Sequence, residues 1–177
     1  IIAYGISLGF PATEAKFFTS YTLMAMVATY ALGVVLIPKY IRQGTALKIS
    51  ALLGIIFTIC ILFTTGFISV LFVAALGIAN ALVWPAVWPL TLEGLGKFTK
   101  TASALLIMAI SGGAIIPPLY GRMVDSNKME LIASGVNEAE AISTASTGSY
   151  WILLPCYAII LYFALAGHKL GKKRINT

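Results

Sequence analysis

A polar and aromatic stripe is the part of this sequence best suited to chemistry. Asn80, Trp84 and Trp88 recur at intervals of four residues, so on a helix they share one face. The apolar face of a sugar ring can lie on an indole, and a side-chain amide both donates hydrogen bonds to hydroxyl groups and accepts them. The stripe therefore predicts a carbohydrate pocket. Tryptophans also pack between helices or lie at membrane interfaces, and the spacing leaves these interpretations open.

Two segments with prolines predict breaks in the helices. Pro85 and Pro89 stand within the stripe, where each removes a backbone hydrogen bond and clashes with the preceding turn. Gly113 and Pro117 follow in the segment SALLIMAISGGAIIPPLYG. Transporters build central sites and hinges from discontinuous helices, so we expect bends at these four positions to serve in gating. Close packing of helices through small residues would explain the second segment as well.

Tyr4 is a further candidate for substrate binding. It stands in the opening segment IIAYGISLGF, near the expected outer end of a helix. Its hydroxyl could bind a passing sugar there, although tyrosines are also common at membrane interfaces.

Catalytic and metal-binding patterns are absent from the sequence. The apolar segments contain no Ser/His/Asp set, no HExxH motif and no paired carboxylates, so we predict no enzyme, no cofactor and no metal site. Cys60 and Cys156 each lie in an apolar run, where thiols behave as small hydrophobic groups. All six Asp and Glu residues are expected in loops or at a helix end, so a coupling carboxylate would have to lie in a segment outside this chain.

The elements that must position these residues are membrane-spanning helices. The 177 residues are 59% hydrophobic and only 10% charged, with a mean hydropathy of +0.95, whereas a soluble domain carries roughly a quarter charged residues. A soluble core of this size could not bury so many apolar side chains, but a lipid bilayer accepts them on the outside of helices. We therefore predict an all-α, polytopic membrane protein.

Five apolar runs approach the roughly 20 residues that a membrane span requires. They cover residues 17–37, 49–65, 67–92, 102–120 and 150–166. The opening run, residues 1–10, begins with Ile rather than Met and is about half that length. We interpret it as the end of a truncated helix rather than a secretory signal, with a preceding segment missing.

The basic residues predict the orientation in the membrane, because Lys and Arg in short loops stay on the cytoplasmic side. One set of expected loops and the tail hold Lys39, Arg42, Lys48, Lys97, Lys100, Lys169, Lys172, Lys173 and Arg174. The other side is net acidic. We therefore expect a cytoplasmic C-terminus. Because the basic residues are dispersed over separate loops, no nucleic-acid partner is predicted; the basic tail would also suit anionic lipid.

The motifs also resemble a known family. The run NALVWPAVWPLTLEGLGKFTKTASALLIMAISGGAIIPPLYGRMVD resembles the tenth and eleventh helices of the fucose:proton symporter family, which belongs to the major facilitator superfamily. The marks of the resemblance are the prolines of the first helix and Leu95, Gly96, Thr99, Lys100, Ser103, Gly112, Gly113, Pro117, Gly121 and Asp125. The loop at Gly33, Lys39 and Arg42 is only a degenerate form of the superfamily's loop motif, because it lacks the acid.

The resemblance implies that residues 1–177 are the C-terminal six-helix half of a larger transporter, with five complete spans and the end of a sixth. Such a transporter would lie in the cell inner membrane and import a hexose by alternating access, coupled to protons or sodium. The missing N-terminal half would complete the site and carry the coupling carboxylates. The paired tryptophans look closer to the glucose/galactose branch than to the fucose branch. A transporter of another small solute and a non-transporting sugar sensor remain alternatives.

Overall fold

The computed structural model describes residues 1–37 and 39–169. All regular secondary structure within these two ranges is helical. Five helices are long and apolar enough to cross a membrane: Ala12–Leu36, Gly66–Leu92, Gln43–Phe63, Gly96–Ala133 and Glu138–Leu165. The predicted class, an all-α polytopic membrane protein, is therefore confirmed.

Several of these spans consist of two or more helical segments. In chain order the elements are α1 (Ile2–Ser7), α2 (Ala12–Leu36), α3 (Gln43–Phe63), α4 (Gly66–Ala81), α5 (Val83–Leu92), η1 (Gly96–Phe98), α6 (Thr99–Ala109), η2 (Ile110–Ala114), α7 (Ile116–Ala133), α8 (Glu138–Gly148), η3 (Ser149–Ile152), α9 (Leu153–Leu165) and η4 (Gly167–Lys169). The η elements are 3₁₀ segments, and η2 and η3 each lie inside a span.

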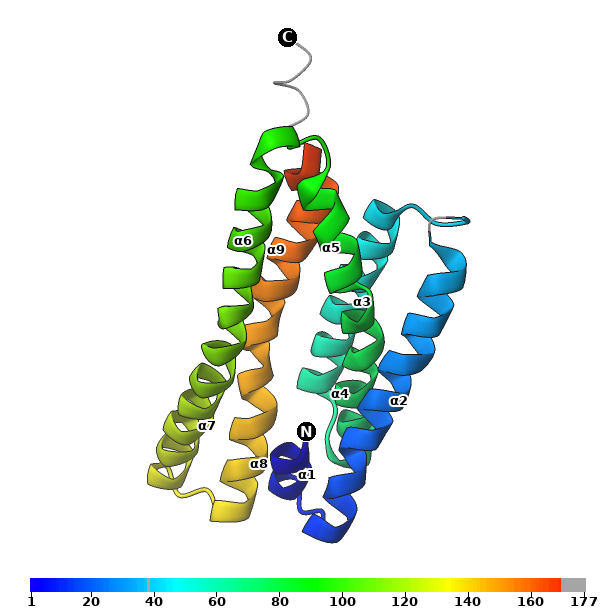
Figure 1. Ribbon diagram of the computed structural model, residues 1–177. Coiled ribbons are helices and arrows are strands. Elements are labelled where there is room, and N and C mark those ends of the chain that lie inside the picture. The colour runs from blue at the N-terminus through cyan, green and yellow to red at the C-terminus, as the bar shows by residue number, and fades with distance from the viewer. Residues whose placement is uncertain (38, 170–177) are drawn as a thin grey trace.

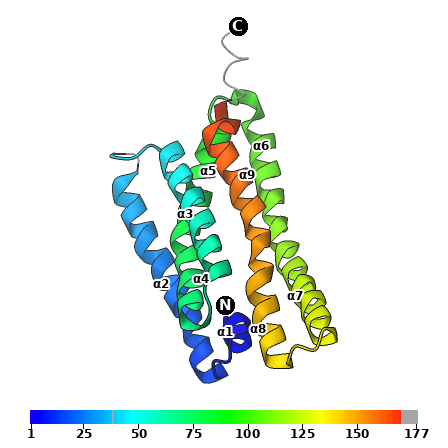
Figure 2. The same cartoon turned by 180° about the vertical axis from the view of Figure 1, so that it is seen from behind.

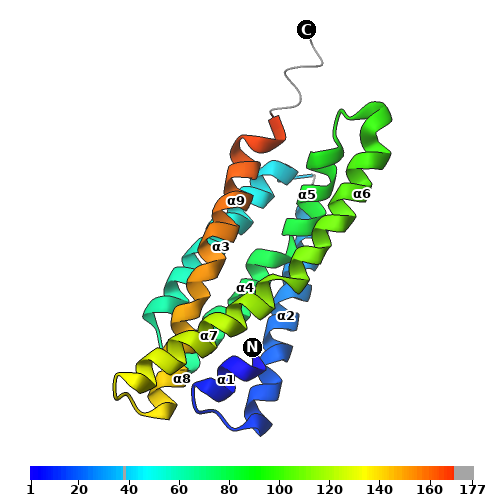
Figure 3. The same ribbon diagram turned by 90° about the vertical axis from the view of Figure 1, so that its left-hand side faces the viewer.

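The long helices run side by side along one axis (Figure 1). The α3 helix has the most neighbours, since it packs against α4, α5 and α9, while α2 packs on the far side of α4. Seen from behind, α3 and α9 lie next to each other (Figure 2). The short α1 segment contacts α2 and α8, and α6 and α7 form the outer edge of the bundle (Figure 3). The N-terminal residue thus lies between the two sides of the bundle (Figure 1).

Small residues determine how closely the inner helices approach. A Cβ atom on Gly77 of α4 would lie only 2.6 Å from the Thr22 carbonyl oxygen on α2, so a larger residue there would push these two helices apart. Because lipid tails are as apolar as the side chains, helices in membranes associate through such close van der Waals contact rather than through the hydrophobic effect. The fully buried side chains Leu47, Ile61 and Val70 all belong to this inner group, on α3 and α4.

The span around residues 102–120 is much longer than its apolar run predicts. It covers Gly96–Ala133, which is 38 residues or about 57 Å of helix, against a hydrocarbon core of about 30 Å. Asp125 and Glu130 therefore lie inside α7 rather than in a loop, which corrects that expectation. Hydropathy marks the part of a helix that must be apolar, whereas backbone hydrogen bonding continues into the polar region.

The connection after α7 is correspondingly short. Only residues 134–137 separate it from α8, so most of the polar stretch from residue 125 to 148 is helical. The side chain of Asn137 caps α8 by accepting a hydrogen bond from the Glu140 N–H at 2.9 Å. An exposed ion pair between Lys128 and Glu138, with an N–O distance of 2.8 Å, joins the two helices across this turn.

Charged residues separate between the two ends of the bundle. At the end where α2 and α5 finish and α3 and α6 begin (Figure 1), the connections carry Lys39, Arg42 and Lys97, and the first turn of α6 carries Lys100. The tail residues Lys172, Lys173 and Arg174 lie outside the described residues. This separation agrees with the charge pattern of the sequence, and the assignment of the basic end to the cytoplasm stays a prediction.

Candidate functional site

The polar and aromatic stripe is divided by a break in its helix. Asn80 is the penultimate residue of α4, while Trp84 and Trp88 belong to α5. Leu82 between them belongs to neither helix, although its φ of −99° and ψ of −3° stay in the right-handed helical region. Pro85 explains the break, because it has no N–H to donate to the carbonyl four residues before it. Helical bonding resumes at once, since the Ala86 N–H donates to the Leu82 carbonyl at 3.1 Å.

The other proline of the stripe does not interrupt the helix. Pro89 lies inside α5, which continues to Leu92, and the Glu93 N–H donates to the Pro89 carbonyl at 3.0 Å. The discontinuity predicted for this helix therefore lies at one place, on the N-terminal side of Pro85.

The two tryptophans form a joint aromatic surface on α5. Their ring centroids are 5.5 Å apart with the planes tilted by 52°. The Trp84 side chain is 44% exposed and Trp88 is half-buried, so one indole face of the pair is available to a partner. Such a surface is chemically suited to stacking with the apolar face of a ring.

Asn80 lies at the edge of a cavity next to α2. The cavity has a volume of about 290 Å³, close to the lower end of the range for small-molecule sites. It is lined by Ile1, Thr19, Thr22, Leu23, Met26, Val73, Leu76, Gly77 and Asn80. The structure thus brings Asn80 together with residues of α2, whereas Trp84 and Trp88 on α5 are not among the residues that line this cavity.

Tyr4 occupies a different place from the stripe. Its side chain is only 3% exposed, and its hydroxyl is within hydrogen-bond distance of Ser69 Oγ (2.6 Å) and Thr147 Oγ1 (3.1 Å). The Tyr4 ring also lies edge-on against Tyr150, with centroids 4.9 Å apart. This hydroxyl therefore joins α1, α4 and α8, and the role in substrate binding stays a prediction.

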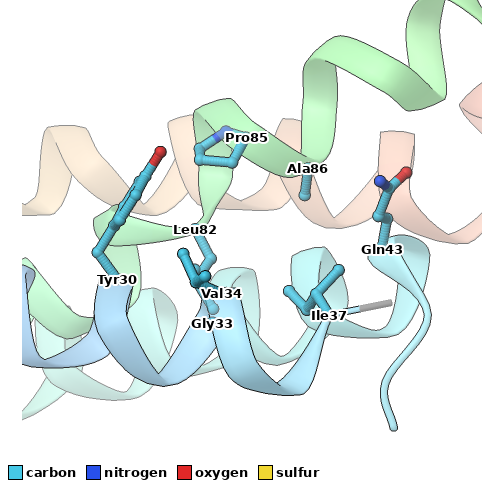
Figure 4. A pocket seen from close by; sticks show the side chains of 8 residues that line it. All are labelled: Tyr30, Gly33, Val34, Ile37, Gln43, Leu82, Pro85 and Ala86. Atoms are coloured by element: carbon cyan, nitrogen blue, oxygen red, sulfur yellow. The ribbon is translucent and has the colours of Figure 1, made fainter. Parts of the chain in front are cut away.

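Cavities flank the break at Leu82 on both sides. The Leu82 side chain lies directly against Gly33 of α2, where a Cβ atom would overlap it. One cavity of about 170 Å³ is lined by Tyr30, Gly33, Val34, Ile37, Gln43, Leu82, Pro85 and Ala86 (Figure 4). A second, almost entirely apolar cavity of about 180 Å³ lies between α2 and α3 and also reaches Leu82. The broken turn thus has free volume around it.

The second proline segment is interrupted as well. Gly113 lies in the 3₁₀ segment η2, and Pro117 stands in the first turn of α7. Because Pro117 has no N–H, the carbonyl four residues earlier, that of Gly113, loses its usual helical partner. Next to it, the Ile115 N–H donates to the Gly112 carbonyl three residues earlier, at 3.0 Å, which is the bonding pattern of a 3₁₀ turn. That either break acts as a gate stays a prediction.

Sequence reasoning missed one residue that contacts the stripe. The Tyr157 hydroxyl of α9 donates a hydrogen bond to Asn80 Oδ1 at 3.0 Å. A tyrosine in an apolar helix signals that its hydroxyl needs a partner, but the partner depends on how α9 packs. The polar residues Thr19 and Thr22 were also missed, although their spacing on an apolar helix places them on one face.

The described residues hold no group that suggests a metal centre. Among residues 1–37 and 39–169, no cluster of three or more His, Cys, Asp or Glu side chains lies close enough to bind an ion. Cys60 and Cys156 are free thiols within these ranges.

Comparison with curated proteins identifies relatives that are sugar transporters by name. The chain is 35% identical over 133 residues to a glucose/galactose transporter of Brucella abortus. This match covers 74% of the chain and 28% of that protein. It is 33% identical over 157 residues to a putative glucose/galactose transporter of Helicobacter pylori, covering 89% of the chain and 35% of the relative. Over most of its own length the chain is thus similar to these transporters.

A more distant relative is named for a different sugar. The L-fucose-proton symporter of Haemophilus influenzae is 25% identical over 185 residues, covering 97% of this chain and 37% of that protein. The chain thus spans about a third of the length of these relatives. No family model and no solved structure matches it. The family resemblance expected from the motifs is confirmed.

Proposed function

We propose that this chain is the C-terminal half of a secondary active transporter that imports a hexose by alternating access. The observation that carries the proposal is the placement of Asn80 and the Trp84–Trp88 pair on either side of a helix break, with Asn80 at the edge of a cavity. The names of the relatives, two glucose/galactose transporters and an L-fucose-proton symporter, support a hexose as the substrate.

In this proposal the stripe forms one wall of the sugar site. The exposed indole of Trp84 stacks on the apolar face of the sugar ring, Trp88 supports it from the next turn, and the Asn80 amide bonds to a hydroxyl. Tyr4 lies near the outer end, where its hydroxyl becomes available only if the bonds to Ser69 and Thr147 open. The other wall belongs to the N-terminal half of the protein.

The two helix breaks supply the gates. Free volume on both sides of Leu82 allows α5 to tilt against α2 without first expelling packed side chains. The segment η2, which contains Gly113 and precedes Pro117, gives α6 and α7 a second hinge. Rocking of the two halves would then expose the wall to each side of the membrane in turn.

Coupling to protons or sodium is assigned to the missing half. The acids within the described helices, such as Asp125 and Glu130 on α7, lie toward the end of a helix that is longer than the membrane is thick. One relative is named a proton symporter, which favours protons. We place the protein in the cell inner membrane with its C-terminus in the cytoplasm, following the positive-inside rule.

Uptake into transport-deficient cells that express the full-length parent tests the proposal. Labelled glucose, galactose, fucose and N-acetylglucosamine are supplied with and without a proton uncoupler. Accumulation that collapses with the uncoupler supports proton symport, and accumulation that depends on sodium changes only the coupling ion. Binding of a sugar without uptake would replace the transporter with a sensor, and no response to any sugar would overturn the substrate class.

A further inference from the structure

Tyr157 of α9 lies in a slot formed by a glycine on the neighbouring helix. Its ring crosses α3 at Gly54, where an added Cβ atom would overlap the ring carbons. The side chain is only 4% exposed and belongs to the main apolar cluster. The absence of a side chain at Gly54 therefore determines where the phenol ring can lie, and the packed backbone of α3 prevents it from moving.

The ring's position brings its hydroxyl to the candidate sugar site. The Tyr157 hydroxyl donates to Asn80 Oδ1 at 3.0 Å, so three helices, α9, α3 and α4, combine to make this one contact. A phenol hydroxyl can donate one proton and can also accept, whereas a carboxamide has one oxygen acceptor and an NH₂ group with two donors. Because the Tyr157 hydroxyl donates here, the bond occupies the oxygen side of the Asn80 amide.

The other side of the amide is free. Within residues 1–37 and 39–169, no acceptor lies within hydrogen-bond distance of Asn80 Nδ2, and the Asn80 side chain is exposed at the edge of the 290 Å³ cavity. An amide can rotate by half a turn with little change in shape, which exchanges donor for acceptor. A phenol oxygen could also accept a bond from the NH₂ group, but within residues 1–37 and 39–169 no other acceptor lies within hydrogen-bond distance of the Tyr157 hydroxyl. The exchange would therefore leave the Tyr157 proton without a partner.

We propose that Tyr157 is a positioning residue that holds the Asn80 amide so that its NH₂ group, not its oxygen, faces the substrate. This inference rests on the proposed sugar site. It adds a rule of specificity: the sugar must present a hydrogen-bond acceptor at the position that meets Asn80. A hydroxyl oxygen meets this requirement even when its own proton is used elsewhere.

Uptake kinetics of labelled glucose by the full-length transporter test the role of Tyr157. We expect Tyr157→Phe to raise KM about fivefold, the order of one neutral hydrogen bond, with Vmax retained. Tyr162→Phe is the matched control, because Tyr162 is on the same helix and 61% exposed, and it should leave KM unchanged. Asn80→Asp keeps an acceptor for Tyr157 but removes both donors, so its KM should rise more than that of Tyr157→Phe.

Sugar analogues test the direction of the bond in the unmutated protein. Fluorine accepts hydrogen bonds weakly but donates none, and a deoxy position does neither. At one ring position we expect the fluoro sugar to compete with glucose clearly better than the deoxy sugar, and this difference should disappear in Tyr157→Phe. Equal loss for the fluoro and deoxy sugars at every position would overturn the proposal, even if Tyr157→Phe fails to fold.

The remaining outcomes separate the two proposals. An unchanged KM in a folded Tyr157→Phe variant, together with a raised KM in Asn80→Ala, rejects the positioning role and keeps the sugar site. An unchanged KM in Asn80→Ala rejects both the positioning role and Asn80 as a site residue, while uptake itself remains. Loss of uptake by the unmutated protein for all four sugars rejects the proposed function.

Discussion

The two sides of this helical bundle are equally suited to a membrane but packed very differently. In the span Gly66–Leu92, 44% of the residues in the most apolar stretch are buried, whereas none are buried in the span Gly96–Ala133. The inner span meets α2 and α3 on two sides, while α6 and α7 touch the bundle along one edge. Hydropathy thus measures which helices suit lipid, and it does not measure which helices form the core.

The difference in packing indicates which helices stabilise the bundle and which helices are free to move. The inner group of α3 to α5 with α9 is held by close contacts at glycines and by buried hydroxyls. The outer helices are held by a few polar links, among them the hydrogen bond from the Tyr120 hydroxyl to the Ser146 carbonyl at 2.9 Å. A helix with few buried contacts can move or receive a partner at low cost, which suits α6 and α7 to the proposed gate.

The largest effect is expected from filling the slot on α3. Gly54→Val would force its side chain into the Tyr157 ring and should destabilise the protein by more than about 3 kcal/mol, because neither helix can yield. Gly112→Ala, on the outer span, meets nothing within 4 Å and is the control. Melting of the detergent-solubilised protein measures both. Equal melting temperatures would contradict the packing difference.

A leucine pair gives a second test of the same comparison. Leu47 is fully buried on α3, whereas Leu105 on α6 is 60% exposed. Leu47→Ala should cost about 2–3 kcal/mol through the cavity that it leaves, while Leu105→Ala should cost less than about 0.5 kcal/mol. Both are read from the melting temperature of the full-length protein. A large cost at Leu105 would show that the other half of the transporter covers this face.

Trp84 and Trp151, which are similarly exposed, separate an effect on sugar binding from a general effect of removing an indole. Trp84→Ala should weaken sugar binding at least tenfold, on the order of 1.4 kcal/mol, through loss of the stacking surface. Trp151 is similarly exposed, at 53%, but lies in η3, away from the stripe, so Trp151→Ala should leave affinity unchanged. Equilibrium binding of labelled sugar measures both variants. Unchanged affinity in Trp84→Ala would reject the stacking role.

The smallest effect is expected at the link between α7 and α8. Tyr120→Phe removes one hydrogen bond to the Ser146 carbonyl and should cost about 1 kcal/mol in stability. If α6 and α7 form a gate, the same change should alter the maximum rate of uptake more than KM. Thermal melting and uptake kinetics together measure this. A change in KM alone would argue that α7 contacts the sugar rather than gating it.

Prolines and apolar runs made much of the fold predictable. The break near Pro85 and the irregular segment before Pro117 follow from covalent chemistry, because a missing N–H leaves a carbonyl without its partner wherever the helix packs. The end of α7 was not predictable in this way, since Asp125 and Glu130 are typical of a loop, yet α7 continues to Ala133. Tyr4 appeared available from its position, but its hydroxyl is bonded inside the bundle.

The amino-acid sequence by itself determined the class of protein and the number of long apolar helices. The physical reason is that lipid offers the backbone no hydrogen bonds, so every apolar run of sufficient length must be a helix. Only the tertiary structure decided that Tyr157 crosses Gly54 to reach Asn80. Such contacts depend on the rotation and depth of each helix, and in a bilayer, where lipid tolerates any apolar face, these are decided by the close fit between helices.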